Sequence, residues 1–287
     1  METSEPSLVP GKLTSAGNAV NIKAAARNAD GSAKELSAFT EPIQIHFSYQ
    51  GHESDENLLG VYAWNTSTSK WDYIGAKMNK KGKQISAEVS KPGIYTVMSY
   101  HASFSDLPAS HWAHDAVVSL AARHIINGMN EDSFAPQGLT TRAEFAAMLV
   151  RALGIPSSGN ESATFSDVKA NDWFVKDVNA AMAAGLIKGV DEQSFAPNQI
   201  ITREQMAVLL LRALEYKKQD GLSTPEAANS YADQDQVSSW AQKAVDSVTQ
   251  LGLMKGKGQQ KFDPLAAATR AETAKVMNEL LLKLDTN

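Results

Sequence analysis

The chain has 287 residues, of which 43% are hydrophobic and 21% charged, a composition typical of a soluble globular protein with about two domains. Its formal net charge of −5 argues against a general nucleic-acid-binding protein, and no apolar run approaches the ~20 residues that cross a bilayer. Cysteine is absent, which excludes disulfides, thiolate metal sites and cysteine nucleophiles.

The first twenty residues lack the basic and then apolar pattern of a signal peptide. We therefore expect one of two situations. Either the protein stays inside the cell, or this chain is a fragment of a longer exported protein.

Residues 1–102 alternate with the period of β-strands and predict an all-β, sandwich-like module. In "IQIHFSY" the apolar side chains at positions 43, 45, 47 and 49 face one way. The segments "VYAW" and "WDYIGAKM" flank the polar turn "NTSTSK" and predict a hairpin. "QISAEVS" and "IYTVMSY" complete the set. A spacer or accessory role is our expectation for this module.

Four aromatic residues flank that hairpin: Tyr62, Trp64, Trp71 and Tyr73. The simpler interpretation is packing between neighbouring strands. The alternative is a sugar-binding face.

From residue 103 onward the apolar period becomes helical and the chain repeats itself three times. Each unit has a Trp, a Gly sixteen positions later, a Phe six after that, a Pro two positions further, and then a Thr-Arg step. The aligned Trp, Gly and Phe positions are Trp112, Gly128 and Phe134, then Trp173, Gly189 and Phe195, and finally Trp240, Gly256 and Phe262. No gap varies between the Trp and the Arg, and length variation sits in the linkers "GIPSSGNESAT" and "YKKQDGLSTPEAANS", where loops tolerate it.

This spacing predicts helix, turn, short loop and helix in each unit. The first helix of the first unit should run from near Trp112 to about Ile126, with Gly128 ending it at positive φ. The loop Phe should be buried, and the second helix should begin at the Thr-Arg step with an apolar stripe along one face. One helical hairpin cannot bury such a stripe alone, so we expect the three units to pack on each other.

The start of each second helix has the spacing of a capping box, in which the Thr side chain accepts from the backbone and an acid or amide reaches back. The pairs are Thr141 with Glu144, Thr202 with Gln205, and Thr269 with Glu272. For these six residues we predict helix capping.

The cap does not explain the arginine that follows each Thr, because a cation at a helix start is unfavourable by roughly 0.3–1 kcal/mol. Arg142, Arg203 and Arg270 occupy this position in the three units. A solvated charge or a surface ion pair is one interpretation. The other is an anion site, in which helix-start N–H groups and a guanidinium hold a carboxylate. Three copies favour the anion site.

The stretch "FSDLPASHWAHDAVVSLAARHIINGMNEDSFAPQGLTTRAEFAAMLVRALG" resembles an S-layer homology motif, and the next two units resemble a second and a third. The resemblance covers residues 103–287, with repeats at about 103–155, 164–216 and 230–285. It implies an all-α domain with a pseudo-threefold arrangement. It also implies an extracellular location at the bacterial cell surface or S-layer, and binding to an anionic, pyruvylated secondary cell-wall polymer. The fold class is then α+β, with a β module followed by a helical domain.

Two further sets recur and complete the predicted polymer-binding residues. Asp106, Asp167 and Asp233 open the units, either as turn residues or as acceptors for sugar hydroxyls. Trp112, Trp173 and Trp240 either pack internally or stack on a sugar ring.

The third unit departs most from the pattern. It has one more residue between Asp233 and Trp240, and "KGKGQQKFDP" in its loop. We expect its site to be the least like the others, unless the extra lysines add contacts to an anion.

No catalytic, cofactor or calcium motif is present, and His111 and His114 have no counterparts in the second unit, so we expect a non-enzymatic protein without metal or cofactor. The alternatives are the anchor and accessory region of a wall- or polysaccharide-degrading enzyme, and a scaffold that binds other surface-layer proteins.

Overall fold

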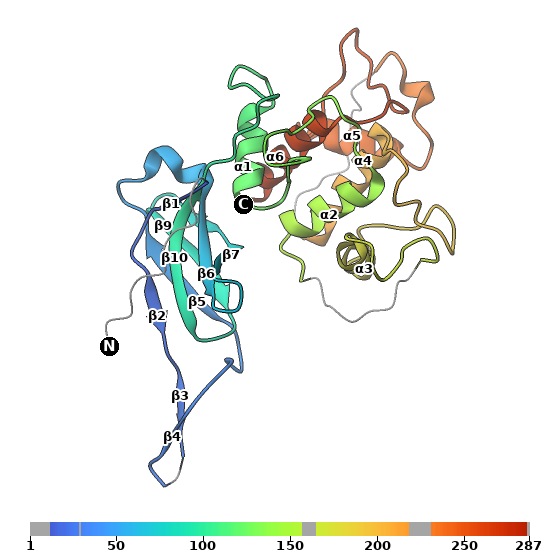
Figure 1. The fold of residues 1–287 in the computed structure, drawn as a ribbon. Helices are drawn as coiled ribbons and strands as arrows, with labels where there is room; N and C mark the ends of the chain where they lie inside the picture. Colours follow the sequence, from blue (N-terminus) through green and yellow to red (C-terminus); the bar gives the residue numbers. More distant parts are fainter. Residues whose placement is uncertain (1–11, 29, 157–164, 218–230, 286–287) are drawn as a thin grey trace. The chain divides into compact units, whose positions relative to one another are not determined.

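The computed structural model describes residues 12–28, 30–156, 165–217 and 231–285. The two linkers named above and the first eleven residues lie largely outside these ranges. The chain divides into two compact units, one made of Met1–Ser103 with Val118–His124, the other of Phe104–Val117 with Ile125–Asn287. Strands precede helices, which gives an α+β chain (Figure 1). The boundary expected after residue 102 stays a prediction.

The β unit contains two antiparallel sheets and a separate hairpin. In the larger sheet the strand order is β1 (Leu13–Ser15), β10 (Gly93–Tyr100), β6 (Leu59–Asn65) and β7 (Lys70–Gly75), with β2 (Val20–Ile22) also paired to β10. The smaller sheet has the order β5 (Ile43–Ser48), β9 (Gln84–Val89) and β8 (Lys77–Asn79). The hairpin of β3 (Ala25–Arg27) and β4 (Ala33–Glu35) extends beyond both sheets in Figure 1. A 3₁₀ helix, η1, spans Glu53–Leu58.

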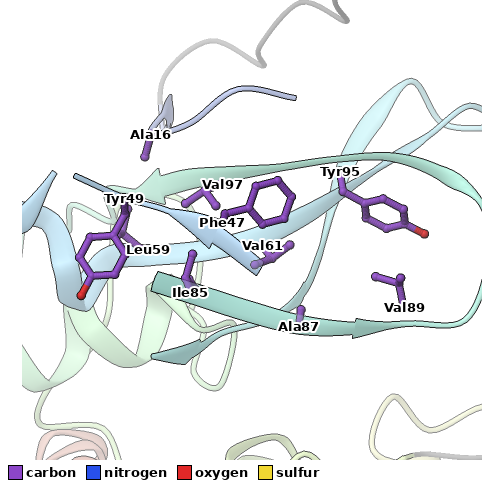
Figure 2. Close-up of a cluster of buried hydrophobic side chains, with 10 residues drawn as sticks. All are labelled: Ala16, Phe47, Tyr49, Leu59, Val61, Ile85, Ala87, Val89, Tyr95 and Val97. Atoms are coloured by element: carbon purple, nitrogen blue, oxygen red, sulfur yellow. The ribbon is translucent and has the colours of Figure 1, made fainter. Parts of the chain in front are cut away.

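The core of this unit is built by side chains from both sheets. Val61, Tyr95 and Val97 of the larger sheet share one buried cluster with Phe47 and Ile85 of the smaller sheet (Figure 2). Side chains alternate between the two faces of a strand, so neighbouring residues in the strands of the larger sheet point away from this cluster. On that opposite face Tyr62, Trp71 and Met98 form a second cluster.

The predicted hairpin and its aromatic packing are confirmed. Trp64 lies opposite Trp71 with ring centroids 5.3 Å apart, and Tyr62 lies opposite Tyr73 at 5.5 Å. Both pairs meet edge to face, the arrangement that the ring quadrupole favours. The alternation predicted for β5 is confirmed only near its end, because Phe47 is buried while Ile43 is 39% exposed.

The helical unit repeats a short helix followed by a longer one. The short helices are α1 (His114–Ala122), α3 (Val175–Ala183) and α5 (Gln242–Gln250), with a 3₁₀ helix η2 at Gln234–Gln236. The longer ones are α2 (Arg142–Ala152), α4 (Arg203–Tyr216) and α6 (Arg270–Asp285). Each longer helix begins at the predicted Thr-Arg step, and the loop residues Phe134, Phe195 and Phe262 are buried as expected. None of the described helices is long and apolar enough to cross a membrane.

The prediction that Gly128 ends the first helix at positive φ is wrong. The helix ends at Ala122, and the left-handed residue is His124, with Gly185 and Gly252 at the equivalent positions of the other units. Gly128 is needed for a different reason. A Cβ at this position would lie 2.4 Å from the Asn130 carbonyl oxygen, closer than atoms can approach. Since the same crowding recurs at Gly189 and Gly256, these glycines serve close backbone approach.

Within the helical unit, three backbone hydrogen bonds connect the three sequence repeats, called the first, second and third unit below, in a closed ring just before the longer helices. The N–H of Thr140 donates to Ala268 O, that of Ile201 to Thr140 O, and that of Ala268 to Ile201 O, at 3.0–3.1 Å. All three residues are fully buried. The ring brings the starts of α2, α4 and α6 together, and this proximity is what allows residues of different units to share a site.

Candidate ligand-binding pockets

The three predicted capping boxes are present. In α2 the Thr141 hydroxyl accepts from the Glu144 N–H at 3.2 Å, and the Glu144 carboxylate accepts from the Thr141 N–H at 2.7 Å. Thr202 with Gln205 and Thr269 with Glu272 repeat this arrangement. Gln and Glu therefore close the same box in one chain, so the box tolerates either side chain.

The expectation that free N–H groups at these helix starts attract an anion is wrong. The N–H groups of the first two residues of α2 donate to the carbonyls of Gln199 and Pro197 in the next unit. The starts of α4 and α6 donate in the same way to carbonyls at 266 and 264 and at 138 and 136. Since the third N–H is held by the capping Thr, the donors at each helix start are satisfied within the protein.

Each arginine of the Thr-Arg step reaches across to the neighbouring unit. Arg203 is 4% exposed and donates Nε to Phe262 O at 2.8 Å and Nη2 to Lys255 O at 2.7 Å. Its guanidinium carbon lies 4.8 Å from the centroid of the Phe262 ring. Arg142 makes the same contacts with Phe195 and Lys188.

Arg270 closes the cycle by donating to the carbonyls of Phe134 and Asn127 in the first unit, 136 and 143 positions away in sequence. Burial lowers the pKa of all three guanidinium groups, which remain protonated at neutral pH. Neither a solvated charge nor a simple surface pair describes these arginines. They hold neighbouring units together.

The aspartates that open the units position the loops that receive these arginines. Asp233 accepts from the N–H groups of Phe262 and Asp263, both at 2.8 Å, and Asp263 has a positive φ of 61°. Asp106 and Asp167 hold the equivalent residues of the first two units. The carboxylates thus stabilise a strained loop, and the Phe carbonyl of that loop accepts a hydrogen bond from the arginine. None of the three aspartates is a lining residue of the pockets described next.

The three repeated tryptophans are exposed. Trp112, Trp173 and Trp240 have 58%, 61% and 58% of their surface accessible, so internal packing does not account for them. Each lines a pocket together with an arginine of the Thr-Arg step. We name the pockets after their tryptophans.

Each pocket combines residues of three units. The Trp173 pocket, about 280 Å³, receives its tryptophan from the second unit and Arg270 from the third. The first unit supplies the turn at 125–129 together with Glu144 and Arg151. The Trp240 pocket, about 420 Å³, takes Arg142 from the first unit and a turn with Lys188, Gln205 and Arg212 from the second. The Trp112 pocket, about 290 Å³, takes Arg203 from the second unit, and the rest of its wall comes from the third.

The pockets contain cations that the sequence pattern did not single out. Arg151 and Arg212 stand nine positions after the Thr-Arg arginines on the same helices, a register that comparison of the copies could have revealed. The Trp112 pocket has Glu279 at that register and instead contains three lysines, at positions 255, 257 and 275. Two of these belong to the "KGKGQQKFDP" loop, so two of that loop's three lysines line the pocket and Lys261 does not.

Within the described ranges, no group of three or more His, Asp or Glu side chains is placed to hold a metal ion.

Comparison with known proteins connects this geometry to a family. The model of the S-layer homology domain matches residues 103–146, 164–207 and 230–274, the segments that supply the three pocket tryptophans and the three arginines of the Thr-Arg steps. The chain carries three S-layer homology domains. The matched segments end within the longer helices, so the family pattern includes each capping box and its arginine.

Relatives fall into two groups. An amylopullulanase of Thermoanaerobacterium thermosulfurigenes is 35% identical over 85% of this chain, and the exoglucanase XynX of Acetivibrio thermocellus is 34% identical over 83%. The surface-layer 125 kDa protein of Lysinibacillus sphaericus is 30% identical over 73%. The chain spans only 13%, 21% and 18% of these relatives. Because residues 103–287 make up less than two thirds of the chain, each of these matches includes part of the β module as well as the S-layer homology domains.

Proposed function

We propose that this chain anchors a bacterial surface protein non-covalently to the cell wall by binding an anionic secondary cell-wall polymer. The observation that carries the proposal is the recurrence of one pocket three times, each with an exposed indole beside cations. An indole face is suited to the apolar face of a sugar ring, and a cation beside it is suited to a carboxylate on that sugar.

The closed ring of hydrogen bonds and the cyclic sharing of pocket residues support a pseudo-threefold arrangement of the repeats. In such an arrangement three weak sites engage successive units of one polymer, and the second and third contacts are effectively intramolecular. A pyruvate ketal on an amino sugar is the ligand we propose, because it presents a carboxylate on a sugar ring. The proposed domains are a β module at 1–102 and the S-layer homology domain at 103–287.

Within this function the nine predicted binding residues take different roles. The tryptophans contact the sugar directly and the arginines both build and line the pockets, while the aspartates position the loops. The proposed location is the cell wall or surface layer, and the proposed partners there include other surface-layer proteins.

The test removes the three exposed indoles. The triple variant Trp112→Ala, Trp173→Ala, Trp240→Ala should lose at least about tenfold in affinity for purified cell walls carrying the polymer, the change that ~1.4 kcal/mol produces. Its helical circular dichroism should stay that of the wild type, since the side chains are about 60% exposed. Tyr216→Ala on α4 is the matched control, because this exposed aromatic residue lines none of the three pockets. Undiminished sedimentation of the triple variant with cell walls contradicts the proposal. Chemical removal of the ketal should abolish binding, and undiminished binding after its removal contradicts the ketal as the ligand.

The similarity to two polysaccharide-degrading relatives favours a second candidate, the anchor and accessory region of such an enzyme. This candidate keeps the wall-binding pockets and differs in assigning an enzymatic or accessory role to the β module that precedes them. Release of soluble sugar from wall glycans by the full chain would support activity in the β module. A scaffold for other surface proteins predicts instead that free polymer does not compete with binding.

A further inference from the structure

The three pockets differ in how far their cations are already neutralised by the protein's own carboxylates. Resting on the function proposed above, we propose that the Trp240 pocket is the principal site for the anionic group of the ligand. The Trp173 pocket is the weakest of the three. One difference in the capping boxes, Gln205 where the other units have Glu, sets the Trp240 pocket apart from the other two, and ion pairs within the protein order the remaining two.

In the Trp173 pocket both cations are paired internally. Arg270 donates Nε and Nη2 to carbonyls, and its remaining Nη1 lies 3.4 Å from the Glu144 carboxylate. Arg151, whose guanidinium lies 6.0 Å from the Trp173 ring, pairs with Asp177 at 2.8 Å. An incoming carboxylate must therefore compete with acids that are already in place.

The Trp240 pocket has the same construction without the acid. Arg142 donates Nε and Nη2 to carbonyls, and Gln205 fills the position of Glu144, so no carboxylate lines the pocket. Arg212 donates to the Leu186 carbonyl at 3.2 Å, and the lining residue Lys188 is exposed. Two acids act from outside the lining, Asp167 on Arg142 and Glu215 on Arg212. Asp167 is itself held by two backbone N–H groups. Three cations face the pocket with no carboxylate among its lining residues.

The Trp112 pocket lies between these extremes. Lys257 pairs with Glu272 at 2.9 Å and Lys275 pairs with Glu279 at 2.8 Å. Arg203 and Lys255 are the two lining cations left over, although Glu272 also acts on Arg203. The expected order of affinity for a monoanionic sugar is Trp240 pocket, then Trp112 pocket, then Trp173 pocket.

A reciprocal exchange tests this order without disturbing the caps, since both side chains already close the same box in this chain. Gln205→Glu places a carboxylate beside Arg142, and Glu144→Gln removes the one beside Arg270. The probe is an N-acetylhexosamine carrying a pyruvate ketal, with its methyl ester as the uncharged control. Calorimetry gives the affinity. The indole N–H resonances, assigned by Trp112→Phe, Trp173→Phe and Trp240→Phe, report which pocket fills first.

In the wild type the Trp240 resonance should shift at the lowest probe concentration, and the methyl ester should leave it unmoved. Gln205→Glu should weaken this site about tenfold, and Glu144→Gln should strengthen the Trp173 site by a similar factor. The ranking is overturned if all three indole resonances shift together and equally. It is also overturned if both variants melt at the wild-type temperature and their affinities are unchanged. Either result leaves the wall-anchoring function intact. If the wild type binds neither the probe nor the cell walls, the proposed function itself is contradicted.

Discussion

Arg203→Ala should destabilise the helical unit strongly, because this guanidinium links two units before it meets any ligand. The change removes two hydrogen bonds from a charged donor and leaves the carbonyls of Phe262 and Lys255 unpaired in a region where Arg203 is only 4% exposed. Each such bond is worth about 1.5–3 kcal/mol. The contact with the Phe262 ring adds roughly 0.5–2 kcal/mol.

An opposing effect is small. Removal of a cation from the start of α4 relieves an unfavourable interaction with the helix dipole of roughly 0.3–1 kcal/mol. We therefore expect a net loss of about 3–5 kcal/mol in the free energy of unfolding, in the range measured when one partner of a buried polar contact is deleted. Arg203→Lys keeps the charge but cannot span two carbonyls, so it should lose about half as much.

The assay is urea denaturation followed by far-ultraviolet circular dichroism, which reports on the helices. Arg27→Ala in the exposed strand β3 is the control and should change stability by less than about 0.5 kcal/mol. If Arg203→Ala falls within that same margin, the guanidinium does not hold the units together and the reasoning fails. The expected result also means that weaker wall binding by such variants cannot by itself be attributed to a lost ligand contact.

Two further predictions concern the loops that shape the pockets. Gly189→Ala should lower stability by about 1–3 kcal/mol, because the new Cβ would lie 2.2 Å from the Asp191 carbonyl oxygen; Gly17→Ala, with 3.6 Å to its nearest neighbour, should be nearly neutral in the same thermal melt. Burial raises the pKa of Asp233, but the N–H groups of Phe262 and Asp263 outweigh this effect and hold it below its usual value. The folded state therefore gains stability above the unfolded pKa of about 3.9 and loses it as the pH falls through the lower folded value. Melting temperatures measured between neutral and acid pH should fall more steeply for the wild type than for Asp233→Asn, and parallel curves would contradict the role of this carboxylate.

Sequence alone determined the features that depend on neighbouring residues. The capping boxes, the starts of α2, α4 and α6, the burial of Phe134 and its counterparts and the Trp64–Trp71 pairing follow from local spacing and from the period of the strands. The same local reasoning assigned the wrong role to Gly128, because its crowding comes from carbonyls that fold back over it.

Only the tertiary structure decided where the arginines go and what surrounds them. Arg270 meets partners 136 and 143 positions earlier, and each pocket draws on three units, which no spacing within one unit can reveal. The helix-start N–H groups looked available in sequence but are used by carbonyls of the neighbouring unit. Pocket charge depends on the acid or amide beside an arginine from another repeat. The charge of a pocket is therefore decided by how the three repeats pack together. Gln205 lines a pocket with Arg142 only because the ring of hydrogen bonds brings their helices together.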